Sequence, residues 1–138
     1  MSRSRSIIVP VPIAPDDPER AHEIVHVKQL NGADTALFQE YVQPASTELK
    51  DGGDTRVFGK MIPYIKQQGY AAYLSITESN LKWDDGSNVF SKLPADRNSQ
   101  GWDSFWKEFA ELSTTDRNLI WQAIVSVNPT LEPENPKN

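Results

Sequence analysis

The chain has 138 residues, a formal net charge of −5 and no cysteine. This length allows one domain with a modest core, because two separate cores would each be of marginal size. The negative charge argues against nucleic-acid binding, which needs basic patches that neutralise phosphates. The lack of cysteine excludes disulfides, thiolate nucleophiles and cysteine-ligated metal centres, so stability has to come from packing.

Prolines gather near both ends of the sequence, where they discourage regular packing. We therefore predict an extended or partly disordered arm over residues 1–22, a single α+β domain over residues 23–129 and a disordered tail over residues 130–138. The apolar stretch at residues 7–13 is interrupted by two prolines and is too short to span a bilayer. We expect no membrane segment and, by default, a cytoplasmic protein.

The first elements are expected to be extended. Residues 6–13 are punctuated by prolines, which suits an edge strand. Residues 23–30 alternate in character, with Val25 and Val27 on one face and His26 on the other. Together the two segments predict a small N-terminal strand pair or hairpin.

Apolar residues at helical spacing between Ala33 and Val42 predict a short amphipathic helix, which Pro44 ends. The stretch that follows, residues 43–55, is polar and rich in glycine. We expect it to be a mobile loop that divides the domain.

A second amphipathic helix is expected from near Thr55, because apolar side chains as far as Ile65 share one broad face. Pro63 lies inside this run and should either kink the helix or delay its true start. Residues 70–77 are ambiguous, since their alanines favour helix and their β-branched residues favour strand.

Asp84-Asp85-Gly86 has the composition of a tight turn whose glycine accepts a positive φ. It separates Leu81-Lys82-Trp83 from Asn88-Val89-Phe90, which predicts a hairpin. Residues 93–101 are expected to form a loop.

The last third of the sequence has the clearest pattern. Apolar residues recur there at three- and four-residue intervals: Trp102, Phe105, Trp106, Phe109 and Leu112. The segment from Ser113 to Asp116 offers a capping box for a further helix, which Asn128-Pro129 ends. Because only the cap separates the two helices, we expect a C-terminal antiparallel helix hairpin.

No catalytic, cofactor-binding or metal-binding residue is predicted. His22 and His26 would share one face of a helix, but their neighbours indicate a strand, in which they lie roughly 13 Å apart. A calcium loop aligned on Gly86 would put Lys92 where a bidentate acid belongs. The sequence has no nucleophile elbow and no phosphate loop. A histidine-dependent hydrolase is therefore the least supported hypothesis.

The last helix carries more apolar surface than one core face needs. Trp121 and Val125 lie off its main apolar line by roughly 100°. We predict that these two residues, together with Trp102 and Trp106, bind a protein partner. A helix buried on two sides, and an aromatic stripe that belongs to the core, explain the same pattern.

Four short motifs follow one another along the chain. They are Val27-Lys28-Gln29-Leu30-Asn31-Gly32-Ala33-Asp34 opening a helix, Leu74-Ser75-Ile76, Asp84-Asp85-Gly86 leading to Val89-Phe90, and a terminal helix ending in Val127-Asn128-Pro129. In this order and spacing, over residues 24–129, the sequence resembles the tail assembly chaperones of long-tailed bacteriophages. The family often has Arg-Glu-Leu-Thr-Gly where this chain has Lys28-Gln29-Leu30-Asn31-Gly32, and it is usually less rich in tryptophan.

The resemblance implies a non-enzymatic chaperone that binds the tape measure protein and aids tail tube assembly, in the cytoplasm of the host cell. It also implies the tail tube protein as a second partner. The alternative hypothesis is a general protein-binding adaptor or inhibitor module. Neither hypothesis involves a cofactor, and neither predicts an oligomeric state.

Overall fold

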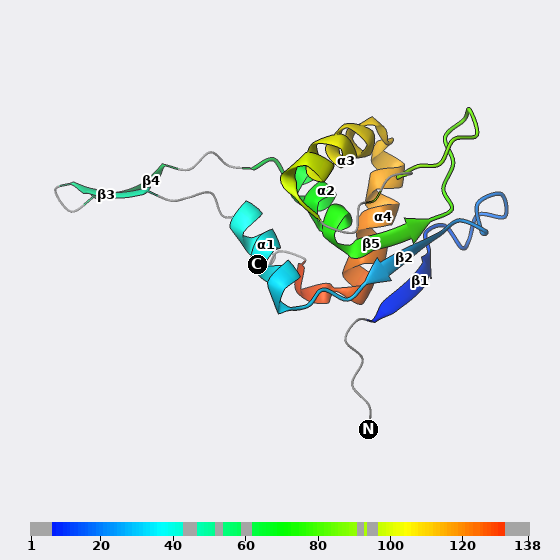
Figure 1. The fold of residues 1–138 in the computed structure, drawn as a ribbon, viewed down its shortest axis with the longest axis horizontal. Coiled ribbons are helices and arrows are strands. Elements are labelled where there is room, and N and C mark those ends of the chain that lie inside the picture. Colours follow the sequence, from blue (N-terminus) through cyan, green and yellow to red (C-terminus); the bar gives the residue numbers. More distant parts are fainter. Residues whose placement is uncertain are drawn as a thin grey trace, which may run out of the picture.

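The computed structural model describes residues 7–42, 47–51, 54–58, 62–90, 93 and 97–131, and of residues 47–51 and 54–58 it describes the backbone. The described part has a three-stranded sheet, a two-stranded sheet and four α-helices (Figure 1). This confirms the α+β class. The elements in chain order are β1 (Ile8–Pro12), β2 (Ile24–Lys28), α1 (Gly32–Val42), β3 (Thr47–Asp51), β4 (Asp54–Phe58), α2 (Tyr64–Ser75), β5 (Ile76–Ser79), α3 (Ser99–Glu111), α4 (Thr114–Val127) and the short 3₁₀ helix η1 (Pro129–Leu131).

The three-stranded sheet is antiparallel, and β2 lies between β1 and β5. Val25 and Val27 of β2 are fully buried, and α4 packs on this strand and on β1. The predicted alternation of β2 and the N-terminal strand pair are therefore confirmed. Since β1 forms a full ladder with β2, residues 8–12 of the expected N-terminal arm belong to the sheet.

Helix α2 is the central element of the helical layer, because α1, α3 and α4 all pack on it. Its last five residues, from Ala71 to Ser75, are all buried. The helix begins directly after Pro63, whose φ of −54° suits a helix start. Pro63 therefore delays the helix, which was one of the two predicted outcomes.

The prediction of a helix from Thr55 is wrong, because Asp54–Phe58 is strand β4. It pairs antiparallel with β3, which lies inside the predicted mobile loop of residues 43–55. The sequence explains the difference, since Gly59 and Pro63 interrupt the apolar run before a helix can gain a full turn. The rest of the predicted loop, residues 43–46 and 52–53, lies outside the described residues.

The ambiguous segment of residues 70–77 contains both predicted states. Helix α2 continues to Ser75, whose hydroxyl donates to the carbonyl of Ala71, and β5 starts at the next residue. The strand pairs with β2 through a register shift between His26 and Val27. Helix and strand thus follow each other without a loop residue.

The tight turn at residues 84–86 is confirmed. Gly86 has a φ of +87°, and its N–H donates to the carbonyl of Trp83 at 2.9 Å. The flanking segments join through the single bridge between Lys82 and Asn88, not through two regular strands. The turn is thus the predicted one, but the segments that it joins pair over fewer residues than a regular hairpin would.

The two predicted C-terminal helices are present and are separated by Leu112 and Ser113, but α3 and α4 pack mainly on α2 and not on each other as a helix hairpin would. Helix α3 begins at Ser99, inside the segment predicted as loop, because Asn98 caps it by accepting the N–H of Gly101 at 3.0 Å. Residues 94–96 of that segment lie outside the described part of the chain. The aromatic spacing begins only at Trp102 and does not indicate this earlier start.

Replacing Ser113 by alanine should lower the free energy of unfolding by about 1 kcal/mol. The Ser113 hydroxyl accepts the N–H of Asp116 at 3.1 Å, and alanine leaves that donor without a side-chain partner. Urea unfolding followed by tryptophan fluorescence measures the change. Ser113→Asp, which retains an acceptor, is the control and should remain near the parent value.

A candidate protein-binding groove

A groove of about 810 Å³ lies between α4 and the segment that runs from the end of β1 through residues 13–20. Its apolar wall on the α4 side is made by Leu119 and Ala123. The opposite wall includes Val11, Pro12 and Ala14. The two walls come from segments about a hundred residues apart in the sequence, so the groove exists only in the folded chain.

Prolines and local hydrogen bonds shape the segment opposite α4. Pro12, Pro15 and Pro18 each fix φ near −65° and lack a backbone N–H, which disfavours a helix in this segment. The N–H of Asp17 donates to the carbonyl of Ala14 at 3.2 Å, which closes a turn. The Asp17 carboxylate then accepts the N–H of Glu19 at 3.0 Å. Local hydrogen bonds thus fix the conformation of this segment.

Arg20 joins this segment to α4. Its guanidinium lies 2.7 Å from a carboxylate oxygen of Glu23 and 2.8 Å from one of Asp116, in the first turn of α4. Burial lowers the pKa of Arg20, but hydrogen bonds with Asp116 and Glu23 outweigh it and raise the pKa above its ordinary value. The charge of Arg20 is therefore compensated by these two acids.

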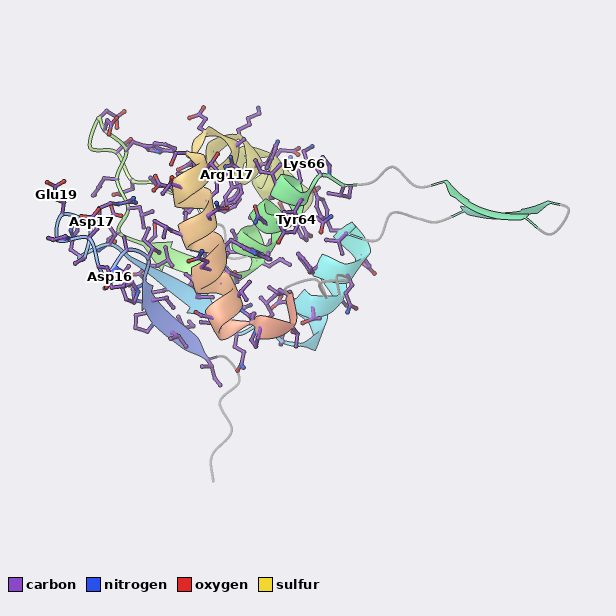
Figure 2. The ribbon with its side chains drawn as sticks, turned by 180° about the vertical axis from the view of Figure 1, so that it is seen from behind. Asp16, Asp17, Glu19, Tyr64, Lys66 and Arg117 are labelled. Atoms are coloured by element: carbon purple, nitrogen blue, oxygen red, sulfur yellow. The ribbon has the colours of Figure 1, made fainter. Side chains whose placement is uncertain are left out.

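The rim of the groove is acidic. Asp16 and Asp17 line it and are exposed, and Glu19 is exposed on the same turn. Figure 2 shows the three side chains together on this loop, whereas Tyr64 and Lys66 lie at the other side of the molecule. Among the described residues, the three acids make no ion pair with a lysine or arginine. The rim consequently carries uncompensated negative charge.

A second hollow of about 520 Å³ continues the groove along β1 and shares Val11, Pro12 and Ser126 with it. Strand β1 is an edge strand, because among the described strands β2 alone pairs with it. Ile7, which lines this second hollow just before β1, is 47% exposed. The outer edge of the sheet therefore forms one side of a continuous apolar trough.

The residues predicted to bind a partner lie elsewhere. Trp121 is only 9% exposed, and its ring meets that of Tyr64 edge-on at 6.1 Å. Val125 is half-buried against the core. Helix α2 covers this second apolar face of α4, which agrees with the alternative of a helix buried on two sides. A partner contact through either residue stays a prediction.

Trp102 and Trp106 belong to an aromatic cluster where α1, α2 and α3 meet. Tyr41 stacks on Tyr70 with ring centroids 4.2 Å apart, and Trp102 meets both rings edge-on. Trp106 adjoins Trp102 at 5.9 Å and carries the ammonium of Lys66 over its ring at 5.3 Å. Both tryptophans are half-buried. Their main contacts are internal, as expected for rings that hold helices together.

Burial raises the pKa of Tyr41, Tyr70 and Tyr73 above the ordinary value of a phenol. The Tyr73 hydroxyl donates to the carbonyl of Asn98 at 2.7 Å, at the start of α3. The three phenols stay protonated at neutral pH, and Tyr73 acts as a structural donor.

The remaining polar candidates also have structural surroundings. His26 is on β2, opposite Glu78 in the register, and the backbone carbonyl of His22 accepts a hydrogen bond from Asn80 at 2.7 Å. The Glu108 carboxylate accepts the N–H of Phe90, which has a φ of +60°. In the part of the chain that the structure describes, no three histidine or acidic side chains are placed to hold a metal ion.

The groove was missed by sequence reasoning, although one signal for it was present. Pro10 and Pro12 predict the edge strand, and Pro15 and Pro18 add a shaped turn after it, but their spacing does not place that turn beside α4. The α4 wall gives no such signal, since Leu119 and Ala123 read as ordinary helix residues. None of the described helices has the length and apolar character needed to cross a membrane.

Comparisons of the chain with protein-family models, with curated proteins and with solved structures give no match.

Proposed function

We propose that this chain is a non-enzymatic chaperone of bacteriophage tail assembly that binds the tape measure protein in the host cytoplasm and aids tail tube assembly. The observation that carries the proposal is the groove between β1 and α4, which is apolar inside, acidic at its rim and about 810 Å³ in volume. Such a groove suits a protein segment, because apolar walls supply affinity and rim charges supply selectivity. The resemblance of the sequence supports the identity of the partner.

The position of the gene gives a first test. The proposal expects it just upstream of a very long gene for a helical tape measure protein. If the neighbouring genes encode no such protein, the proposed partner is wrong, whereas the groove would still suit an adaptor.

Replacing Leu119 by glutamate should reduce copurification of the tape measure protein at least about tenfold, because it puts a charge into the apolar wall of the groove. The two proteins are co-expressed, the chain is captured through a tag, and the bound tape measure protein is quantified.

Leu37→Glu is the matched control, since Leu37 is a 40% exposed leucine on a different helix, outside the groove. It should retain full copurification. Equal loss in the two variants, or no copurification with the parent chain, would count against the proposal.

A further inference from the structure

The outer edge of β1 has backbone acceptors but few donors. At the two ends of the strand, the N–H of Gln29 donates to the carbonyl of Ile7 at 2.8 Å and the N–H of Ile13 donates to the carbonyl of Glu23 at 3.2 Å. Alternate residues of a strand point their backbone groups to the same side, so the odd-numbered residues face β2. The backbone groups of Ile8, Pro10 and Pro12 therefore point away from β2, to the outer edge of the sheet.

Two of these three outward residues are prolines, which have no N–H. An added strand would place carbonyls opposite Pro10 and Pro12 and find no donor there. The edge thus opposes binding by strand addition. A segment that satisfies its own backbone hydrogen bonds, as an α-helix does, avoids this loss.

The charges around the groove select the side chains of the occupant. The outward carbonyls of β1 and the carboxylates of Asp16, Asp17 and Glu19 are all acceptors, while Arg20, the cation of the groove lining, is held by Glu23 and Asp116. Lysine and arginine bring donors and positive charge to such a surface. An acidic occupant would be repelled.

The length of the groove limits the occupant. Five residues of β1 extend over roughly 16 Å, and α4 beside it is somewhat longer. A segment of this length holds roughly three helical turns. That is enough for apolar residues at positions i, i+3 or i+4, and i+7 to reach the apolar floor.

We infer that the groove between β1 and α4 binds one amphipathic helix of a partner protein, with lysine or arginine flanking its apolar stripe, and does not bind an added strand. The inference rests on the proposed function only in assigning a protein partner to this groove. It names the chemistry and conformation of the segment that binds.

The test uses synthetic peptides with the full-length chain. The probe is a fluorescein-labelled 16-residue peptide with leucines at helical spacing, flanked by lysines and filled with alanine. Three comparison peptides replace the lysines by glutamate, replace two central alanines by proline, or rearrange the probe's residues into strand alternation. Binding is measured by fluorescence anisotropy at two salt concentrations.

The lysine peptide should bind with an affinity that falls as salt rises, and the other three should bind at least about tenfold more weakly. Equal binding of the glutamate, proline or strand-alternating peptide would overturn the inference. No binding of the lysine peptide would overturn it as well.

Variants of the chain locate the contact. Asp16→Asn with Asp17→Asn removes two rim charges and retains an acceptor for the N–H of Glu19. The double substitution should lower the affinity for the lysine peptide by roughly five- to tenfold at low salt, as expected for two exposed ion pairs. Asp103→Asn with Glu111→Gln makes the same change in net charge on exposed positions of α3 and should leave binding unchanged.

Two further outcomes identify other occupants. If sedimentation shows that the chain is a dimer which Leu119→Glu dissociates, a second copy fills the groove and the inference is wrong. Copurification of the tape measure protein is measured separately. If the chain binds the lysine peptide but not the tape measure protein, the proposed function alone is wrong. If it binds the tape measure protein but not the peptide, this inference alone is wrong.

Discussion

Replacing Gly69 by leucine should lower the free energy of unfolding by at least about 3 kcal/mol and the melting temperature by about 10 °C. Gly69 is buried in the middle of α2, where α3 crosses it. A β-carbon built at this position would lie 3.0 Å from the ring of Phe109 and 3.3 Å from the rings of Trp102 and Trp106. Phe109 is fully buried and has no room to retreat.

The same geometry makes Gly69→Ala informative. Alanine gains about 1 kcal/mol over glycine in a helix interior, but the contact with Phe109 opposes this gain. We therefore expect the alanine variant to be no more stable than the parent chain. Thermal unfolding followed by circular dichroism compares the two variants.

Gly32→Ala is the matched control. Gly32 is the first residue of α1, and a β-carbon there would meet no atom within 4 Å. This substitution should be neutral or stabilise the chain by about 0.5 kcal/mol. If Gly69→Leu proved as stable as Gly32→Ala, the close approach of α2 and α3 would be contradicted.

Replacing Asn128 by alanine should cost about 3 kcal/mol of stability, the second large effect. Asn128 is 6% exposed at the end of α4. Its side-chain carbonyl accepts the N–H of Leu30 at 2.8 Å, and its amide donates to the carbonyl of Lys28 at 3.0 Å. Alanine would leave both backbone groups without these partners in a site that water reaches poorly.

Asn80 provides a control with the same bonding pattern. Its side chain accepts the N–H of Ile24 and donates to the carbonyl of His22, both at 2.7 Å, but Asn80 is exposed. Water can replace the lost partners there, so Asn80→Ala should cost about 1 kcal/mol. Urea unfolding of both variants measures the difference. If the two variants lost the same free energy of unfolding, burial of Asn128 would not explain its larger expected loss.

These two sites explain why the fold needs contacts between distant parts of the sequence. Asn128 joins the end of α4 to the last residue of β2 and to Leu30 after it, across about a hundred residues of chain. Gly69 lets α3 approach α2 closely enough for Phe109 to pack. Gly69 belongs to no sequence pattern, and the sequence indicated Asn128 only as the end of the last helix.

The candidate site was harder to predict than the fold. Trp121 was predicted to bind a partner, with a helix buried on two sides as the alternative, and it is buried where α2 covers α4. The groove is instead lined by residues such as Ala14 and Leu119, which belong to no distinctive sequence motif. A tryptophan draws attention through its size, and size alone predicts burial as readily as binding.

The sequence by itself determined the features that depend on neighbouring residues. The Ser113 cap, the turn at Gly86, the alternation in β2 and the interruption at Pro63 were all readable, because each arises from backbone preferences within a few positions. The prolines of β1 likewise make its outer edge poor in donors.

Only the tertiary structure decided which apolar faces are covered and which stay open. Trp121 and Leu119 lie two residues apart on α4, yet α2 packs over the first and the second lines a groove. That outcome depends on how α2, β1 and α4 pack together. The hydrophobic effect is non-directional, so the local sequence does not specify which element covers a given apolar side chain.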